Sequence, residues 1–278
     1  MPRTDGKLVK NIPTFDKLIP RIMNKRYDAT NYTRVEIDIT RLNQYLRELR
    51  GRGHRVGLMD CMITSLALVM ETTPEINRFV ANKKIYQRNH RCVSFALIKR
   101  QNGELVETVI KLQIEKGDDL VKISDKIRAE IKKNKEPTGK NMVDKFVGAL
   151  SGMPLLPSVA IVLFKGMDRI GILPRKIIDL SPFHTSMFIS NLASIKMDYV
   201  YHHLYEFGTT SIFVTLGKPM RKEMAGETRQ TIILGISIDE RICLGAIWAK
   251  ALHEFRHILE NPERMGALEE IKIKEEVA

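Results

Sequence analysis

The chain has 278 residues, of which 44% are hydrophobic, and its formal charge at pH 7 is +12. That length and apolar content suffice for one large core, and no Gly-, Ser- or Pro-rich linker divides the sequence, so we expect a single domain over residues 1–278. The positive charge suits an anionic ligand, nucleic acid or a membrane surface. The basic residues are scattered, without zinc-ligand spacing or an aromatic RNA-binding motif, and no apolar run reaches the ~20 residues of a membrane span. We therefore expect neither nucleic acid nor a membrane as partner.

Three isolated cysteines, Cys61, Cys92 and Cys243, lie in apolar segments. Their odd number and lack of metal-ligand spacing predict small buried hydrophobic residues in a reducing compartment, and neither disulfides nor a metal site. The N-terminal residues contain no apolar core of the kind found in a signal peptide. We expect a cytoplasmic location.

The first third of the chain predicts three helices, with a strand between the first and the second. Residues 18–27 have the spacing of a short amphipathic helix. Residues 33–40 alternate polar and apolar side chains, which predicts a half-buried strand, and Thr40 then begins a helix that runs to Leu49. Residues 58–72 are apolar on most faces and predict a buried helix.

The middle of the chain predicts a hairpin followed by helices. Residues 93–98 and 105–110 are apolar strands joined around Asn102-Gly103, a strong turn signal. Residues 120–133 predict a charged amphipathic helix.

A strongly apolar segment at 153–164 is interrupted soon afterwards by Lys165, Asp168 and Arg169, so it is too short to span a membrane. We expect one or two helices that cover the sheet or line an apolar substrate pocket, and we favour the covering role because apolar helices are usually core.

Two further strands are predicted at 186–192 and 211–217, which we interpret as a long hairpin closed by residues 198–208. This closing segment contains His202, His203 and Tyr205. Aromatic and imidazole side chains are more frequent here than in the rest of the chain, which has seven histidines in all. Paired histidines beside tyrosine and glutamate can supply a general base and hydroxyl donors at neutral pH. The same residues also fit a packed segment with amphipathic side chains at its rim, and both interpretations stay open.

Near the C-terminus, residues 236–252 predict a buried strand up to Ile238, a turn at Gly245 and a helix that continues through Leu259. Side chains at such a junction are exposed at the end of a sheet, where catalytic groups are often found.

Two stretches resemble a known family. Asp239, Arg241, Gly245 and Asn261-Pro262 match the C-terminal signature of the chloramphenicol acetyltransferase superfamily, and 189–192 (Ile-Ser-Asn-Leu) resembles its Ile-Ser-Asn-Leu-Gly strand. This superfamily includes the catalytic domain of dihydrolipoamide acyltransferases. The resemblance implies an α/β two-layer sandwich with a mixed sheet, assembled as a homotrimer whose active sites lie between subunits. It also implies acyl transfer with coenzyme A as substrate or ligand, and no metal.

Two positions depart from the family pattern. The catalytic histidine of the family falls on Glu240, and its structural aspartate falls on Leu244. In the family that aspartate pairs with an arginine of the opening helix, for which Arg21 or Arg26 is the candidate. A carboxylate near pKa 4.3 matches a thiol near 8.5 poorly, so Glu240 is a weak replacement unless burial raises its pKa.

The resemblance also covers less than a whole dehydrogenase component. Residues 137–180 form an insert relative to lipoamide acyltransferases, and neither a lipoyl domain nor a subunit-binding domain is expected.

The candidate site follows from these assignments. Ser190 is expected to stabilise the oxyanion, and the base is expected to be His203, His202 or a perturbed Glu240. Further members are assigned by role: candidate substrate-binding residues are Asn191, Tyr205 and Thr209, and candidate structural residues are Arg21, Asp239, Arg241 and Gly245. Three functions remain possible: a coenzyme A-dependent acyltransferase acting on acyl-CoA or another acyl thioester, an inactive binding or scaffold protein, and a thioester hydrolase in which Glu240 activates water.

Overall fold

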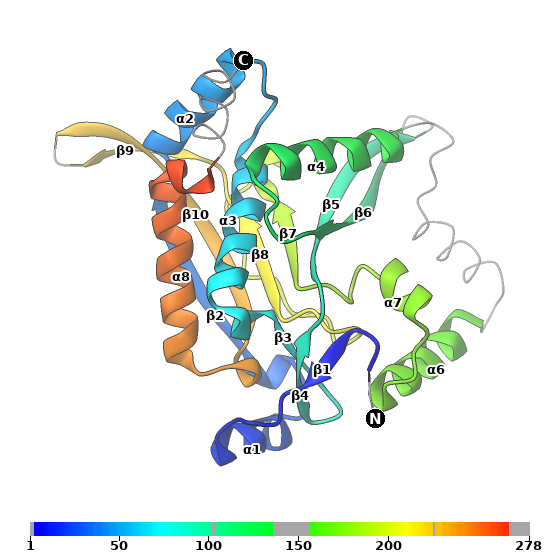
Figure 1. Cartoon of the computed structure of the whole chain (residues 1–278). Helices are drawn as coiled ribbons and strands as arrows, with labels where there is room; N and C mark the ends of the chain where they lie inside the picture. Colours follow the sequence, from blue (N-terminus) through cyan, green and yellow to red (C-terminus); the bar gives the residue numbers. More distant parts are fainter. Residues whose placement is uncertain (1–2, 102–103, 136–155, 225, 267–278) are drawn as a thin grey trace.

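The computed structural model describes residues 3–101, 104–135, 156–224 and 226–266 (Figure 1). Its strands are β1 (Gly6–Leu8), β2 (Thr30–Asp38), β3 (Arg78–Ala81), β4 (Lys84–Arg88), β5 (Arg91–Gln101), β6 (Glu104–Ile114), β7 (Met187–Asn191), β8 (Ile212–Leu216), β9 (Met220–Met224) and β10 (Glu227–Asp239). Its α-helices are α1 (Thr14–Ile22), α2 (Thr40–Gly51), α3 (Leu58–Thr72), α4 (Leu120–Lys135), α6 (Leu156–Ile170), α7 (Arg175–Leu180) and α8 (Gly245–Glu260). Short 3₁₀ turns include η1 (Tyr27–Ala29), η2 (Pro74–Asn77), η3 (Leu192–Ile195), η4 (Glu240–Ile242) and η5 (Pro262–Met265).

The main sheet is mixed, as the resemblance to the chloramphenicol acetyltransferase superfamily implies. Its strand order is β2-β10-β8-β7-β5-β6, and β9 also pairs with β10. Strand β7 is parallel to both of its neighbours, while the other pairs are antiparallel. The expected α/β fold with a mixed sheet is confirmed.

One face of this sheet carries a layer of helices, α2, α3, α4 and α8 (Figure 1). The buried core between the two layers takes Ile236 and Ile238 from β10 and Trp248 and Phe255 from α8. Helix α3 lies against both α4 and α8, so it is buried on most of its surface. This position explains why its sequence is apolar nearly all round.

The expected hairpin of the two strands at 186–192 and 211–217 is wrong, because β7 and β8 run parallel. Parallel neighbours cannot be joined by a tight turn and need a crossover connection. Here residues 192–211 cross the second face of the sheet, where the backbone of Val200 contacts Thr215 of β8 and the ring of His202 stacks on Phe213. The histidine-rich segment is therefore a cover of the sheet and not the tip of a hairpin.

Helix α1 is displaced from its expected range of 18–27, since it begins at Thr14 and ends at Ile22. The chain then turns into η1, and the carboxylate of Glu206 accepts hydrogen bonds from the backbone N–H groups of Arg26 and Tyr27. This tertiary contact with a distant segment, which no local pattern encodes, holds the chain at residues 26–27 outside an α-helix.

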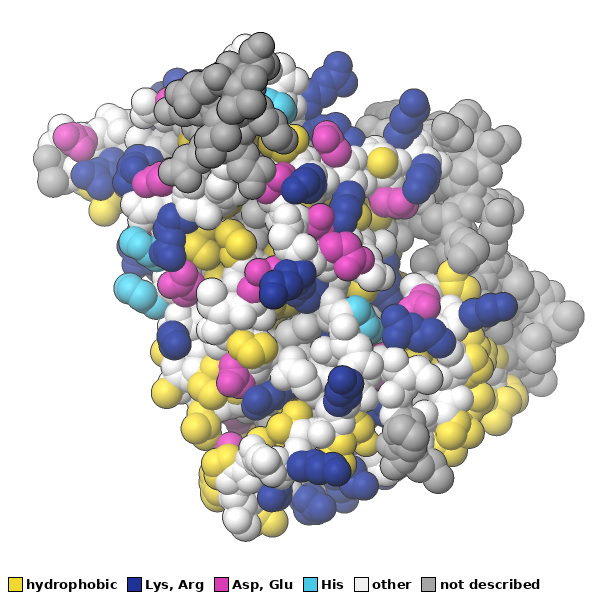
Figure 2. Space-filling view, in the orientation of Figure 1, with side chains coloured by type: hydrophobic (Ala, Val, Ile, Leu, Met, Phe, Trp, Pro, Cys, Tyr) yellow, Lys and Arg dark blue, Asp and Glu magenta, His cyan; other side chains and the backbone are white. Residues whose placement is uncertain are grey.

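Helix α6 differs most from expectation. The first three residues of the apolar stretch predicted at 153–164 lie outside the described residues, as does the predicted insert from 137 to 155. Helix α6 does not cover the sheet with its apolar side chains, because Val159, Val162 and Leu163 are 54–68% exposed. They contribute to the hydrophobic area at the lower right of the molecule (Figures 1 and 2). Within the described ranges, no helix combines the length and apolar character that a membrane crossing requires.

Candidate functional site

A buried ion pair lies directly after β10. Alternation along the strand directs Ile236 and Ile238 to the core under the helices, so Asp239 points to the second face of the sheet. Its two carboxylate oxygens accept hydrogen bonds of 2.7 Å from Nε and Nη2 of Arg241, in the bidentate geometry that favours arginine. Asp239 is fully buried and Arg241 is 5% exposed, so this pair fixes the end of the strand.

Arg26 completes this cluster. Its Nε lies 3.8 Å from Oδ2 of Asp239, while Nη1 and Nη2 donate to the carbonyl oxygens of Tyr205 and Gly208 at 2.6 and 2.8 Å. Burial lowers the pKa of this guanidinium, although Asp239 opposes that effect. Arg21, the other candidate of the opening helix, is exposed and donates to the carbonyl of Lys17 in its own helix. Of the two arginines, Arg26 is the one that the structure brings to Asp239, whereas Arg21 lies away from it at the surface.

Glu240 borders an apolar pocket of about 440 Å³, which it shares with Phe15, Trp248 and Leu252. Its carboxylate accepts a hydrogen bond from Nδ2 of Asn31 on β2. The side chain is partly exposed, so it can meet a ligand in this pocket.

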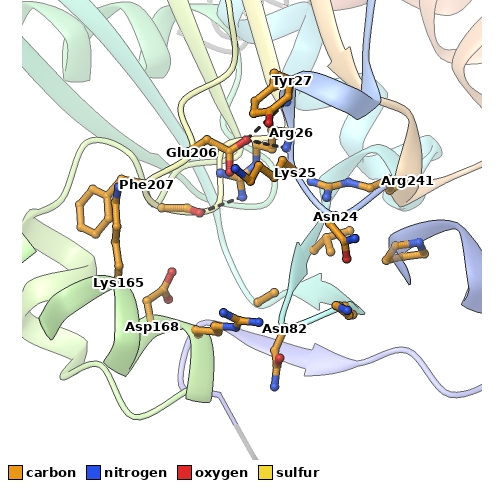
Figure 3. Close-up of a pocket in the computed structure, with 16 residues that line it drawn as sticks. Asn24, Lys25, Arg26, Tyr27, Asn82, Lys165, Asp168, Glu206, Phe207 and Arg241 are labelled. Carbon is orange, nitrogen blue, oxygen red and sulfur yellow. Dashed lines mark hydrogen bonds between the residues drawn. The ribbon is translucent and has the colours of Figure 1, made fainter. Parts of the chain in front are cut away.

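A second pocket, of about 630 Å³, lies on the other side of Arg241, which lines both (Figure 3). Its wall includes Lys25, Arg26, Lys165 and Asp168, contributed by segments far apart in the sequence.

The two predicted histidines lie on the face of the sheet opposite the helices. His202 stacks on Phe213 with ring centroids 3.9 Å apart, and His203 stacks on His202. Nδ1 of His202 is 2.8 Å from the carbonyl oxygen of His203, which can only accept, so Nδ1 carries the proton and Nε2 keeps its lone pair. Partial burial and the neighbouring His203 lower the pKa of His202, against the effect of that hydrogen bond. At pH 7 the ring is neutral and Nε2 can accept a proton.

Ser190 shares this face with the histidines. It is half-buried near the end of β7, two residues after Phe188, which packs on Phe213. Its level in the sheet matches Thr215 of β8 and Gly235 of β10. Glu240 comes five residues after Gly235, which places it about 15 Å from the level of Ser190 along the strand direction. Ser190 and Glu240 therefore do not meet within one chain.

The remaining predicted residues divide between site and scaffold. Tyr205 is half-buried, and its ring packs edge-on against Phe183. Asn191 is half-buried, and its Oδ1 has no hydrogen-bond partner among the described residues. Thr209 is fully buried and accepts hydrogen bonds from Arg88 through both its hydroxyl and its carbonyl oxygen, so it is a scaffold residue and cannot contact substrate.

Gly245 begins α8 with nothing within 4 Å of the position of a Cβ, so the fold does not require glycine there. The structural role of this residue stays a prediction, but the expected turn does not lie at Gly245, which is the first residue of the helix. The turn is η4, residues 240–242.

A buried polar network beneath the second pocket escaped the sequence analysis. Arg3 donates to both carboxylate oxygens of Asp5 and to Oδ1 of Asp168, and Nε2 of His184 lies 3.4 Å from the same Asp168 oxygen. Burial alone would raise the pKa of Asp168, but His184 and Arg3 hold it at about 2. The signal in the sequence was the aspartate that interrupts an apolar helix, and its partner at residue 3 could not be guessed. In the described ranges no group of three His, Cys, Asp or Glu side chains is placed to hold a metal ion.

Comparison with known structures identifies the fold. The described arrangement is similar to a probable dihydrolipoamide acetyltransferase from Listeria monocytogenes 4b F2365, with a TM-score of 0.57, 16% identity, and coverage of 92% of this chain and 95% of the other. It is similar to chloramphenicol acetyltransferase, with a TM-score of 0.54, 10% identity and coverage of 92% and 98%. The chain has the chloramphenicol acetyltransferase-like fold.

The same fold occurs in a truncated catalytic core of the 2-oxoacid dehydrogenase multienzyme complex from Thermoplasma acidophilum, with a TM-score of 0.57, 13% identity and coverage of 92% and 99%. No family model matches the sequence, and no curated protein matches it. The chloramphenicol acetyltransferase-like fold is thus established by three-dimensional similarity, at identities that carry the fold alone.

Proposed function

We propose that the chain is a coenzyme A-dependent acyltransferase in which the base of the family, replaced by Glu240, is supplied by His202. The observation that carries this proposal is the hydrogen bond from His202 Nδ1 to the carbonyl of His203, because it fixes the tautomer whose Nε2 accepts a proton. His202 also shares a face of the sheet with Ser190.

In the proposed reaction, His202 Nε2 takes the proton of the acceptor group as this group attacks the thioester carbonyl. The hydroxyl of Ser190 donates to the oxyanion; as the oxyanion collapses, the bond from the acyl carbon to sulfur breaks, and the protonated His202 gives its proton to the sulfur, so coenzyme A leaves as a thiol and the acyl group stays on the acceptor. Burial, with Glu107 adding to it, raises the pKa of Tyr205, so its hydroxyl stays protonated as a second donor.

The active site of this proposal lies between subunits of a homotrimer. The separation of Ser190 from Glu240 within one chain supports this arrangement, because only a neighbouring chain can bring a second copy of Glu240 to the histidine face. The apolar pocket beside Glu240 offers a place for an acyl or pantetheine chain.

The direct test is acyl transfer from a panel of acyl-CoA thioesters, with release of free thiol followed in the presence and absence of hydroxyl, amine and dithiol acceptors. His202→Ala is expected to reduce acceptor-dependent release by about 100- to 10,000-fold, the range for loss of a general base. Ser190→Ala is expected to cost about 100- to 1,000-fold. His253→Ala, an exposed histidine of α8, serves as the matched control and should retain full activity.

Subunit mixing tests the position of the site. Glu240→Gln alters the pocket that would hold the acyl or pantetheine chain, and Ser190→Ala removes the oxyanion donor. If each variant is inactive alone, their mixed oligomers should regain activity, because some sites combine the intact serine of one chain with the intact pocket of another. Recovery would be absent if both residues acted within one chain.

A second candidate function is ligand binding without turnover. The contact that favours it is the hydrogen bond from Asn31 to Glu240, which holds the carboxylate where the family has its catalytic histidine. Absence of thiol release from every thioester, together with calorimetric binding of coenzyme A, would overturn the acyltransferase and establish this function.

A further inference from the structure

The second pocket concentrates positive charge. The pocket has a volume of about 630 Å³. Its wall includes two carboxylates, Asp168 and Glu206, and six cations: Lys25, Arg26, Lys83, Lys165, Arg169 and Arg241. The cations come from the segment after α1, the β3–β4 turn, α6 and η4. Figure 3 shows Lys165 and Asp168 on the side of the pocket opposite Arg241.

The buried charged groups of this wall already form hydrogen bonds within the protein. Asp168 is held by Arg3, Glu206 accepts from the backbone of Arg26, and Arg241 grips Asp239. The four outer cations form no ion pair with any residue that the structure describes; they are Lys25, Lys83, Lys165 and Arg169. Four unneutralised cations around one concavity focus a positive potential that attracts an anion.

The backbone of the β3–β4 turn gives an independent indication. Asn82 and Lys83 join the two strands with φ of 46° and 60°. Glycine is the usual residue in the second position of such a turn, because a side chain there costs about 1–2 kcal/mol. Lys83 instead places its side chain at the pocket despite that cost, and strained residues of this kind gather at binding sites.

We propose that this pocket binds a phosphate group. Lysine and arginine side chains that converge without carboxylate partners match a multiply charged phosphate, and the volume accommodates a group of phosphate or pyrophosphate size with part of the molecule that bears it. The pocket is distinct from the one beside Glu240, although Arg241 lines both. Two of its cations come from α6, within the segment 137–180 that we expect to be an insert.

Two sources can supply the phosphate. One is a soluble phosphorylated molecule, and the other is the head group of a phospholipid. Helix α6 also exposes Val159, Val162 and Leu163, and Val162 precedes Lys165 by three residues and Arg169 by seven, so an exposed apolar side chain and two cations share one side of the helix. Apolar side chains beside cations are typical of a helix that lies on a lipid surface. The experiment therefore needs one arm for each source.

Inorganic pyrophosphate is titrated by calorimetry for the soluble arm. For the lipid arm, cosedimentation is measured with phosphatidylcholine vesicles that contain or lack phosphatidic acid. The pocket variants are Lys165→Ala/Arg169→Ala and Lys83→Gly. The matched control is Lys132→Ala/Lys133→Ala, which removes the same charge from exposed positions of α4.

Each pocket variant is expected to weaken binding about tenfold or more, whereas the control changes it less than about twofold. Lys83→Gly relieves the turn, so it should lose binding without losing thermal stability, which separates a binding role from a folding role. Pocket-dependent binding of pyrophosphate alone identifies a soluble source, and pocket-dependent binding of phosphatidic acid vesicles identifies a lipid source. Absence of binding in both arms, or equal binding by pocket and control variants, would overturn the proposal.

Discussion

Replacing Asp239 with alanine removes the carboxylate that Arg241 grips with two hydrogen bonds and that lies 3.8 Å from Nε of Arg26. Both guanidiniums stay buried, because the strand end, η4 and the crossover enclose them. Removing one partner of a buried ion pair costs about 3–5 kcal/mol. Carbonyl acceptors remain for each arginine, so we expect a loss of about 4 kcal/mol in the free energy of unfolding, or about 10 °C in Tm.

Urea unfolding followed by the fluorescence of Trp248, the single tryptophan of the chain and 4% exposed, measures this loss. Glu227→Ala, which breaks an exposed ion pair of the same strand, should cost no more than about 1 kcal/mol. Asp239→Ala/Arg241→Met should recover part of the loss, since it removes one uncompensated charge. A loss below about 1 kcal/mol for Asp239→Ala would refute the view that this pair secures the end of β10.

Two further predictions concern stability. The folded-state pKa of Asp168 is held at about 2, below its ordinary value of 3.8, so the stabilisation from this group is present above pH 4 and is lost as the pH falls to 2. We therefore expect the difference in free energy of unfolding between wild type and Asp168→Asn to be about 2 kcal/mol smaller at pH 2 than at pH 5, which urea unfolding at the two pH values measures. Gly208 and Gly226 both have positive φ, but a Cβ at Gly208 would lie 2.3 Å from the carbonyl oxygen of Phe183, whereas Gly226 faces open space. Thermal unfolding should therefore show Gly208→Ala to be at least about 2 kcal/mol more destabilising than Gly226→Ala, and equal losses would contradict this steric reasoning.

Local patterns predicted the elements that obey local rules. The buried helix at 58–72 coincides with α3, and the helix at 120–133 lies within α4, because apolar periodicity reports burial directly. The Asn-Gly signal likewise identified the β5–β6 hairpin, although the turn itself lies outside the described residues.

Pairing between distant segments was not predictable in the same way. The strands β7 and β8 were found, but their apolar runs contain nothing that distinguishes a hairpin from a parallel pair. Arg26 was one of two candidates, and only the carbonyl groups of Tyr205 and Gly208, about 180 residues away, decide between them. Hydrogen bonds of this kind form only because the fold brings two distant segments close together in space, and no local sequence pattern predicts which segments will meet.

The placement of β2 bears on how the protein is made. This strand lies at the end of the strand path and pairs with β10, with Thr30 opposite Asp239. A ribosome that adds about 5–20 residues per second needs roughly 10–40 s to synthesise the stretch between these partners. During that interval β2 has been synthesised but β10, its partner in the sheet, has not. β2 can therefore pair with β10 only after residue 239 has been synthesised, and its backbone N–H and C=O groups lack that partner until then.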